Sequence, residues 1–161
     1  MKKGKVVILL CLLLLSGCGR RGKPLLEPVY FYYPRTEYDY GSDDSVITWE
    51  AMDGTGRMED WEYMIAEYFA GPIDEGLCNP FPEDTTLLSA GVWEDTFFLE
   101  LSPEALTIPE HQFTLGCSCL SMTCFELTQV QAVTVTWGSR QITVPRDGML
   151  LLDDHWPESQ Q

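Results

Sequence analysis

The stretch "PEHQFTLGCSCLSMTCFELTQV" at residues 109–130 decides how the rest of the chain is organised. An α-helix turns by about 100° per residue, so five apolar residues of this stretch fall within about 80° of one another. These residues are Phe113, Cys117, Leu120, Cys124 and Leu127. The spacing predicts a helix that buries this stripe. Gly116 and the nearby Ser and Thr residues lower helix propensity, so a loop over 115–119 is the alternative.

The three cysteines of this stretch are the most direct chemical clue in the sequence. On a helix, Cys117 and Cys124 lie about 10.5 Å apart along the axis, whereas a disulfide needs Cα atoms within about 7 Å. Cys119 points to nearly the opposite face, so the thiols do not converge as zinc ligands must. Because free Cys behaves as a small buried hydrophobe, core thiols are the favoured interpretation. A disulfide that involves Cys78 and a metal or redox centre stay open as alternatives.

Regular elements flank the central stretch on both sides. Strands are predicted at 29–33 and 45–52, and a helix is predicted at 58–69, where apolar residues follow the 3, 4 and 7 spacing. Two β-hairpins are predicted at 85–102 and 132–144. The first turns at Glu94-Asp95, and the second at Gly138-Ser139, which suits a type II′ turn. The order predicts an α+β fold: one small domain with a mainly antiparallel sheet and two helices packed on one face.

The N-terminus carries the marks of a targeting segment. Residues 1–17 combine a basic start, a short apolar run and small residues, which is the pattern of a signal peptide. The ending "LSGC" resembles a bacterial lipobox, in which cleavage before Cys18 leaves its sulfur to carry a diacylglycerol. The alternative is an ordinary secretory signal with an incidental cysteine. Lipidated Cys18 would anchor the mature protein to the outer face of the cell membrane, because two acyl chains suffice for stable anchoring.

The amino-acid composition predicts three segments in the mature chain. Residues 18–28 are predicted to be a lipidated tether, 29–145 a single folded domain, and 146–161 a polar C-terminal tail. Beyond Lys23 only four cations remain, all arginine, against 25 Asp and Glu residues. Such an acidic body repels phosphate backbones, which excludes nucleic acid as a partner. It favours basic partners among the envelope proteins.

Catalytic chemistry finds little support in the sequence. The two histidines, His111 and His155, have no obvious nucleophile partner, and the paired acids at 43–44 and 153–154 are typical of solvated loops. No Gly-rich phosphate loop is present. We therefore expect no catalytic, cofactor-binding or metal-binding residues, and no enzyme; Cys18 is the one expected modification site.

The order of motifs across residues 28–145 is similar to a known family. A helix that ends in "YFAGP" (68–72) is followed by "PEDTTLLS" (82–89) and by a strand pair that closes in "ELS" (100–102). The later "TCFELTQVQAVTVTWGSR" (123–140) matches a helix and strand that end near a glycine. Together these motifs resemble the GerMN domain. Asp84 stands where that family usually has Gly, and Cys124 stands where it usually has Leu.

The resemblance implies an envelope lipoprotein of a Gram-positive, spore-forming bacterium, with a role in sporulation or germination. It implies a small sheet backed by two helices, as in the ring-building modules of membrane assemblies, and no catalytic residues to carry over. The expected function is a non-catalytic, lipid-anchored interaction module that docks on envelope proteins or assembles as a homo-oligomer. The alternative is an extracytoplasmic metal or thiol enzyme, or a receptor for cell-wall ligands.

Overall fold

A computed structural model of the 161-residue chain describes residues 25–37 and 45–149. The predicted signal peptide, Cys18 and residues 150–161 lie outside the described residues. The elements, in chain order, are β1 (Pro28–Pro34), β2 (Ile47–Asp53), α2 (Trp61–Phe69), β3 (Leu87–Trp93), β4 (Thr96–Leu101), the 3₁₀ helix η1 (Pro103–Thr107), α3 (Glu110–Leu127), β5 (Ala132–Trp137), β6 (Arg140–Pro145) and α4 (Arg146–Met149). Every strand and both long helices that the sequence predicted are therefore present.

The first long helix, α2, begins later than the apolar spacing predicted. It starts at Trp61 rather than Met58 because Asp60 caps it: the carboxylate of Asp60 accepts a hydrogen bond from the backbone N–H of Tyr63 at 3.1 Å. A side-chain acceptor at this position satisfies one of the N–H groups that the first helical turn leaves unpaired. Residues 58–60 are thus the approach to the helix.

The strands form two sheets rather than one. β1 pairs with β2 in an antiparallel pair, and β3, β4, β5 and β6 form a four-stranded sheet in that order. The two predicted hairpins supply the outer pairs of the larger sheet, and they join through a parallel pairing of β4 with β5. The chain between these parallel strands crosses over through η1 and α3, as parallel neighbours require. The fold is α+β, with mostly antiparallel strands and two main helices.

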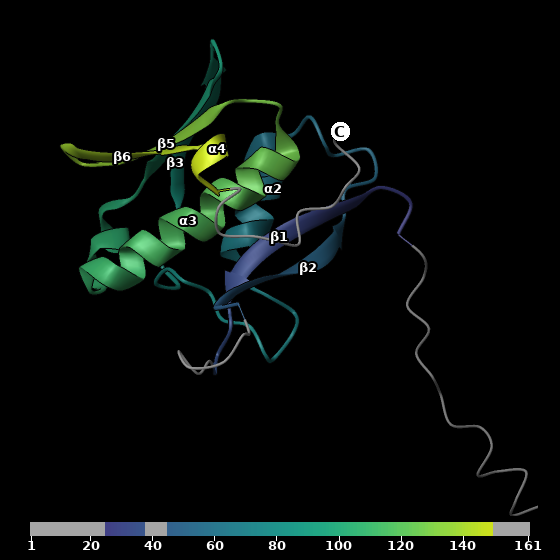
Figure 1. Ribbon diagram of the computed structural model, residues 1–161, viewed down its shortest axis with the longest axis horizontal. Helices are drawn as coiled ribbons and strands as arrows, with labels where there is room; N and C mark the ends of the chain where they lie inside the picture. Colours follow the sequence, from purple (N-terminus) through teal and green to yellow (C-terminus); the bar gives the residue numbers. More distant parts are fainter. Residues whose placement is uncertain (1–24, 38–44, 150–161) are drawn as a thin grey trace, which may run out of the picture.

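Helix α3 runs between the two sheets (Figure 1). The predicted stripe is buried, but so is the opposite side of the helix, including Cys119 and Met122. The prediction of one buried stripe was therefore too narrow. The reason is β1, whose buried aromatic residues cover the second face of α3. At this contact the backbone N–H of Tyr32 donates a hydrogen bond to the hydroxyl of Thr123 at 2.9 Å.

Aromatic rings connect α2 to both sheets. Tyr68 stacks on Tyr33 of β1 with ring centroids 4.8 Å apart, and the Tyr33 hydroxyl donates to the backbone carbonyl of Tyr68 at 2.8 Å. At the other end of α2, Trp61 meets Phe97 of β4 edge to face at 5.4 Å. Such aromatic pairs add to the free energy gained by burying their area. They fix α2 beside β3, which matters for the site described below.

The turn between β3 and β4 contains a strained residue. Glu94 has φ of 51°, a left-handed conformation that glycine adopts without steric cost, and Gly138 fills the equivalent first position of the β5–β6 turn with φ of 57°. A non-glycine residue in this region costs roughly 1 kcal/mol. We expect Glu94→Gly to raise the free energy of unfolding by about that amount. Urea unfolding followed by circular dichroism measures it, and the neighbouring change Asp95→Gly should bring no such gain.

Candidate functional site

The thiols of α3 belong to the core. Cys117, Cys119 and Cys124 are all buried, which confirms the interpretation favoured from the sequence. Burial raises the pKa of the Cys117 thiol to about 12, and it raises the pKa values of Cys119 and Cys124 as well. The thiolate is the form that attacks substrates and binds metals, so these protonated thiols are poor nucleophiles and poor ligands.

Cys78 lies outside α3, on the loop between α2 and β3. It is half-buried, its sulfur lies 3.6 Å from the carbonyl oxygen of Pro34, and it is a free cysteine like the three in α3. Burial raises the pKa of its thiol too. Among the described residues, the structure therefore does not contain the disulfide to Cys78 that the sequence left open as an alternative.

Thiol labelling should separate these two environments. In a soluble chain of residues 24–161, we expect an aromatic disulfide reagent to modify one thiol per folded chain, Cys78. All four thiols should react once the chain is unfolded in guanidinium, because access and thiolate formation then no longer depend on burial. The change Cys78→Ser should reduce labelling of the folded chain to near zero. Rapid modification of two or more thiols in the folded chain would contradict the placement of α3.

The remaining candidates for chemistry are scattered. His111 is exposed in the first turn of α3, and His155 lies outside the described residues. Within 25–37 and 45–149, no group of three or more His, Cys, Asp or Glu side chains is arranged to hold a metal ion. No helix in those ranges is long and apolar enough to cross a membrane. Cys18, the expected lipidation site, lies outside the described residues.

One charged side chain has a structural task that the sequence did not reveal. Arg146 folds back from the end of β6, and its guanidinium donates hydrogen bonds to the carbonyl oxygens of Phe125, Thr128 and Val130 at 2.8–2.9 Å. Desolvation raises the pKa of the nearby Glu126 carboxyl, and the positive charge of Arg146 partly offsets that rise. The contacts satisfy carbonyl groups where α3 ends, which otherwise lack partners. This cluster stabilises the fold.

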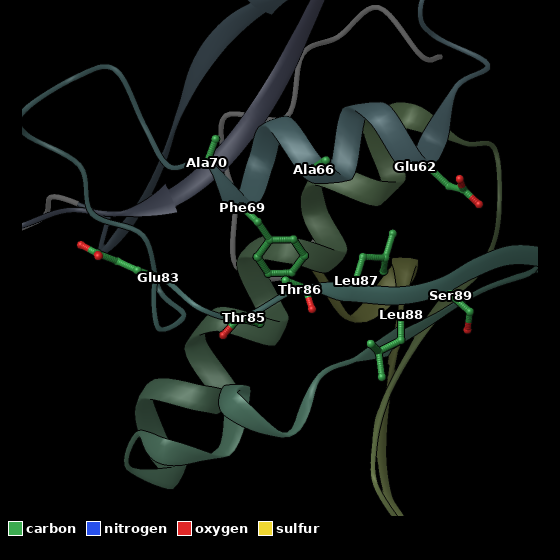
Figure 2. Close-up of a pocket in the computed structure, with 10 residues that line it drawn as sticks. All are labelled: Glu62, Ala66, Phe69, Ala70, Glu83, Thr85, Thr86, Leu87, Leu88 and Ser89. Carbon is green, nitrogen blue, oxygen red and sulfur yellow. The ribbon is translucent and has the colours of Figure 1, made fainter.

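A groove between α2 and β3, shown in Figure 2, is a candidate binding site. Its volume is about 430 Å³. One wall is α2 and the other is the chain from Thr85 into β3, and Phe69 and Leu87 point into the space between them (Figure 2). A carboxylate stands at each end, Glu83 at one and Glu62 at the other. An apolar floor with polar groups at its margins is the usual composition of a binding site.

The groove was missed by sequence reasoning because its walls come from separate parts of the chain. Its one sequence signal is the strand Leu87–Trp93, "LLSAGVW", which contains no charged residue and no proline. A strand of this kind at the edge of a sheet is open to pairing with another chain. Further along β3, Trp93 is 72% exposed, and Phe98 of β4 is 42% exposed on the outer face of the sheet.

Comparison with known proteins supports the fold. No family model and no curated protein matches the sequence. Among solved structures, a candidate lipoprotein from Clostridium perfringens aligns at 17% identity with a TM-score of 0.48, over 78% of this chain and 93% of that one. The tandem GerMN domains of the sporulation protein GerM from Bacillus subtilis align at 21% identity with a TM-score of 0.54, over 74% of this chain and 43% of that one.

The present chain thus spans less than half of the tandem structure that it matches. At this level of identity, the likeness is one of backbone architecture. It confirms, at the level of fold, the resemblance that the order of sequence motifs indicated. The protein is similar in fold to the GerMN domains of GerM.

Proposed function

We propose that the protein is a lipid-anchored, non-catalytic interaction module on the outer face of the membrane of a Gram-positive bacterium. The observation that carries the proposal is the groove between α2 and the edge strand β3, because an elongated apolar groove beside a strand edge suits an extended chain. The α3 thiols, which were the main candidates for chemistry, are buried in the core. The GerMN-like fold supports a role of this kind in sporulation or germination.

The anchor rests on the sequence "LSGC" and on the tether that follows it. A diacylglycerol on the sulfur of Cys18 would supply two acyl chains, such as palmitate, and the cations of the tether would add attraction to anionic headgroups. The acidic domain would then stand away from a membrane surface of the same sign of charge. Its exposed grooves and edges would face other envelope proteins or further copies of the chain.

Fatty-acid labelling tests the anchor. The full chain, expressed in a Gram-positive host fed with an alkyne fatty acid, should take up the label and sediment with membranes. Cys18→Ser should lose the label, whereas the matched change Cys11→Ser, which falls in the predicted signal peptide, should keep it. Equal labelling of both variants would refute a lipid on Cys18.

Native mass spectrometry tests the absence of metal chemistry. Reduced residues 24–161 should appear at the mass of the polypeptide alone or of a regular oligomer. A stoichiometric metal adduct would instead favour the metal or thiol enzyme.

Deleting the gene in a spore-forming host should lower the yield of heat-resistant or germinating spores, and unchanged yields would count against the sporulation role.

A further inference from the structure

We propose that the groove between α2 and β3 binds an extended, basic segment of a partner protein, which adds as a strand to the free edge of β3. The inference rests on the proposed interaction function and makes it specific: it names the surface, the binding mode and the chemistry of the partner. It does not depend on lipidation of Cys18.

The first support comes from the two edges of the four-stranded sheet. β3 and β6 are both edge strands, since the strand order is β3-β4-β5-β6. Strand β6 begins at Arg140 and ends at Pro145, and charges and prolines are devices that block pairing with another chain. Strand β3 has neither, and its Leu88 side chain is 56% exposed. The register of β3 with β4 shifts between Leu87 and Ser89, and the pairing is regular from Ser89 to Trp93. The edge without charge or proline is therefore the one that borders the groove.

The second support is the wall that faces this edge. Helix α2 presents Ala66 and Ala70 to the groove, one turn apart, and both are exposed. Small side chains at these positions leave the helix wall of the groove without long side chains that would cover the edge of β3. Peptides added to a sheet edge gain affinity from main-chain hydrogen bonds and specificity from pockets for alternate side chains. Phe69 and Leu87 provide an apolar pocket midway along the groove (Figure 2).

The third support is charge. Glu83 and Glu62 are exposed at opposite ends of the groove (Figure 2). In the part of the chain that the structure describes, the one ion pair joins Arg57 and Asp60 at 3.4 Å. Neither groove carboxylate takes part in it, so both are free to pair with a ligand. The occupant is therefore cationic. Two copies of a chain with formal net charge −15 would repel each other at this acidic surface, which disfavours edge-to-edge pairing of the protein with itself.

The geometry predicts a pattern in the partner. From Glu62 to Ala70 a helix advances by about 12 Å, and an extended strand covers that length in about four residues. Side chains at i, i+2 and i+4 point to the same face of a strand. We expect Lys or Arg at i and i+4, toward the two ends of the groove where the carboxylates stand, and an apolar residue at i+2, above Phe69 and Leu87. The segment thus reads basic-x-apolar-x-basic.

A synthetic peptide tests the proposal directly. The probe is a fluorescent peptide with the core Lys-Thr-Leu-Thr-Lys, and its control has glutamate in place of both lysines. Binding to the full chain, purified in detergent micelles, is measured by fluorescence anisotropy. The double variant Glu62→Lys, Glu83→Lys should weaken binding at least tenfold. The charge-matched variant Glu75→Lys, Asp147→Lys, whose sites are exposed outside the groove, should weaken it by about threefold or less.

Hydrogen exchange of the same samples locates the bound peptide. Slower exchange of amides in Leu87–Trp93 on peptide binding, together with the selective effect of the groove variant, would support strand addition. The proposal is overturned by equal weakening in both double variants, by protection of another surface, or by no binding at about 1 mM peptide. Any of these results would leave a lipid-anchored protein that interacts through another surface, because the anchor fails separately, in the labelling of Cys18.

Discussion

Replacing Gly116 with valine is expected to lower the free energy of unfolding by about 2–3 kcal/mol. A Cβ atom at this position would lie 2.9 Å from Cζ of Phe81 and 3.1 Å from its Cε1. The ring cannot move aside easily, since it is buried and packs against Phe69 and Phe113 at centroid distances of 5.5 and 6.1 Å. The better helix propensity of valine offsets only a few tenths of a kcal/mol.

The matched control for this change is Gly91→Val in β3. A Cβ atom at Gly91 meets nothing within 4 Å, and valine favours strands, so stability should stay equal or rise slightly. Urea unfolding followed by circular dichroism compares the two. Equal midpoints for Gly116→Val and Gly91→Val would show that Phe81 does not rest on the helix backbone.

Replacing Arg146 with methionine is expected to cost about 3 kcal/mol of stability. Methionine keeps an apolar stem over the Phe125 ring, which the guanidinium now covers at 4.6 Å, but it donates no hydrogen bond. The carbonyls of Phe125, Thr128 and Val130 would then lose a charged donor where they are partly buried. Lysine should recover only part of the loss, because an ammonium lacks the planar fork that reaches several acceptors.

Arg140 provides the control for charge alone. It is exposed at the start of β6, and Arg140→Met removes the same charge from the acidic chain. Its cost should stay within about 0.5 kcal/mol, as for most surface substitutions. A similar cost for both arginines would mean that net charge, rather than the end of α3, accounts for the effect.

Local patterns predicted the elements well, because each depends on neighbours in the sequence. The 29–33 and 45–52 strands, both hairpins and both long helices are present, and the α3 thiols are buried. The covering of Cys119 was not predictable in this way, since it depends on β1, far away along the chain. Gly116 lowered the helix propensity of its stretch, and only the position of Phe81 explains why glycine stands there.

Long-range pairings account for the other omissions. The parallel contact of β4 with β5 joins two hairpins that the sequence presents as separate units. Arg146 looked like the first residue of a polar tail, yet it makes contacts at the end of α3. The groove likewise arises only when α2 comes to lie beside β3. Its sequence signal is a strand without charge or proline. That signal can be recognised only when the strand order shows that β3 lies at the edge of the sheet.

Site-specific photo-cross-linking on the living cell tests the interaction module most directly. A benzophenone amino acid is placed at Ala66 in the groove of the full, lipid-anchored chain, and at the exposed Gln112 of α3 as a matched control. We predict that Ala66 yields an adduct whose cross-linked peptide, identified by mass spectrometry, is an extended basic segment of another envelope protein, and that Gln112 does not. Adducts from Gln112 alone, or none from Ala66 in cells that make the protein, would contradict the account.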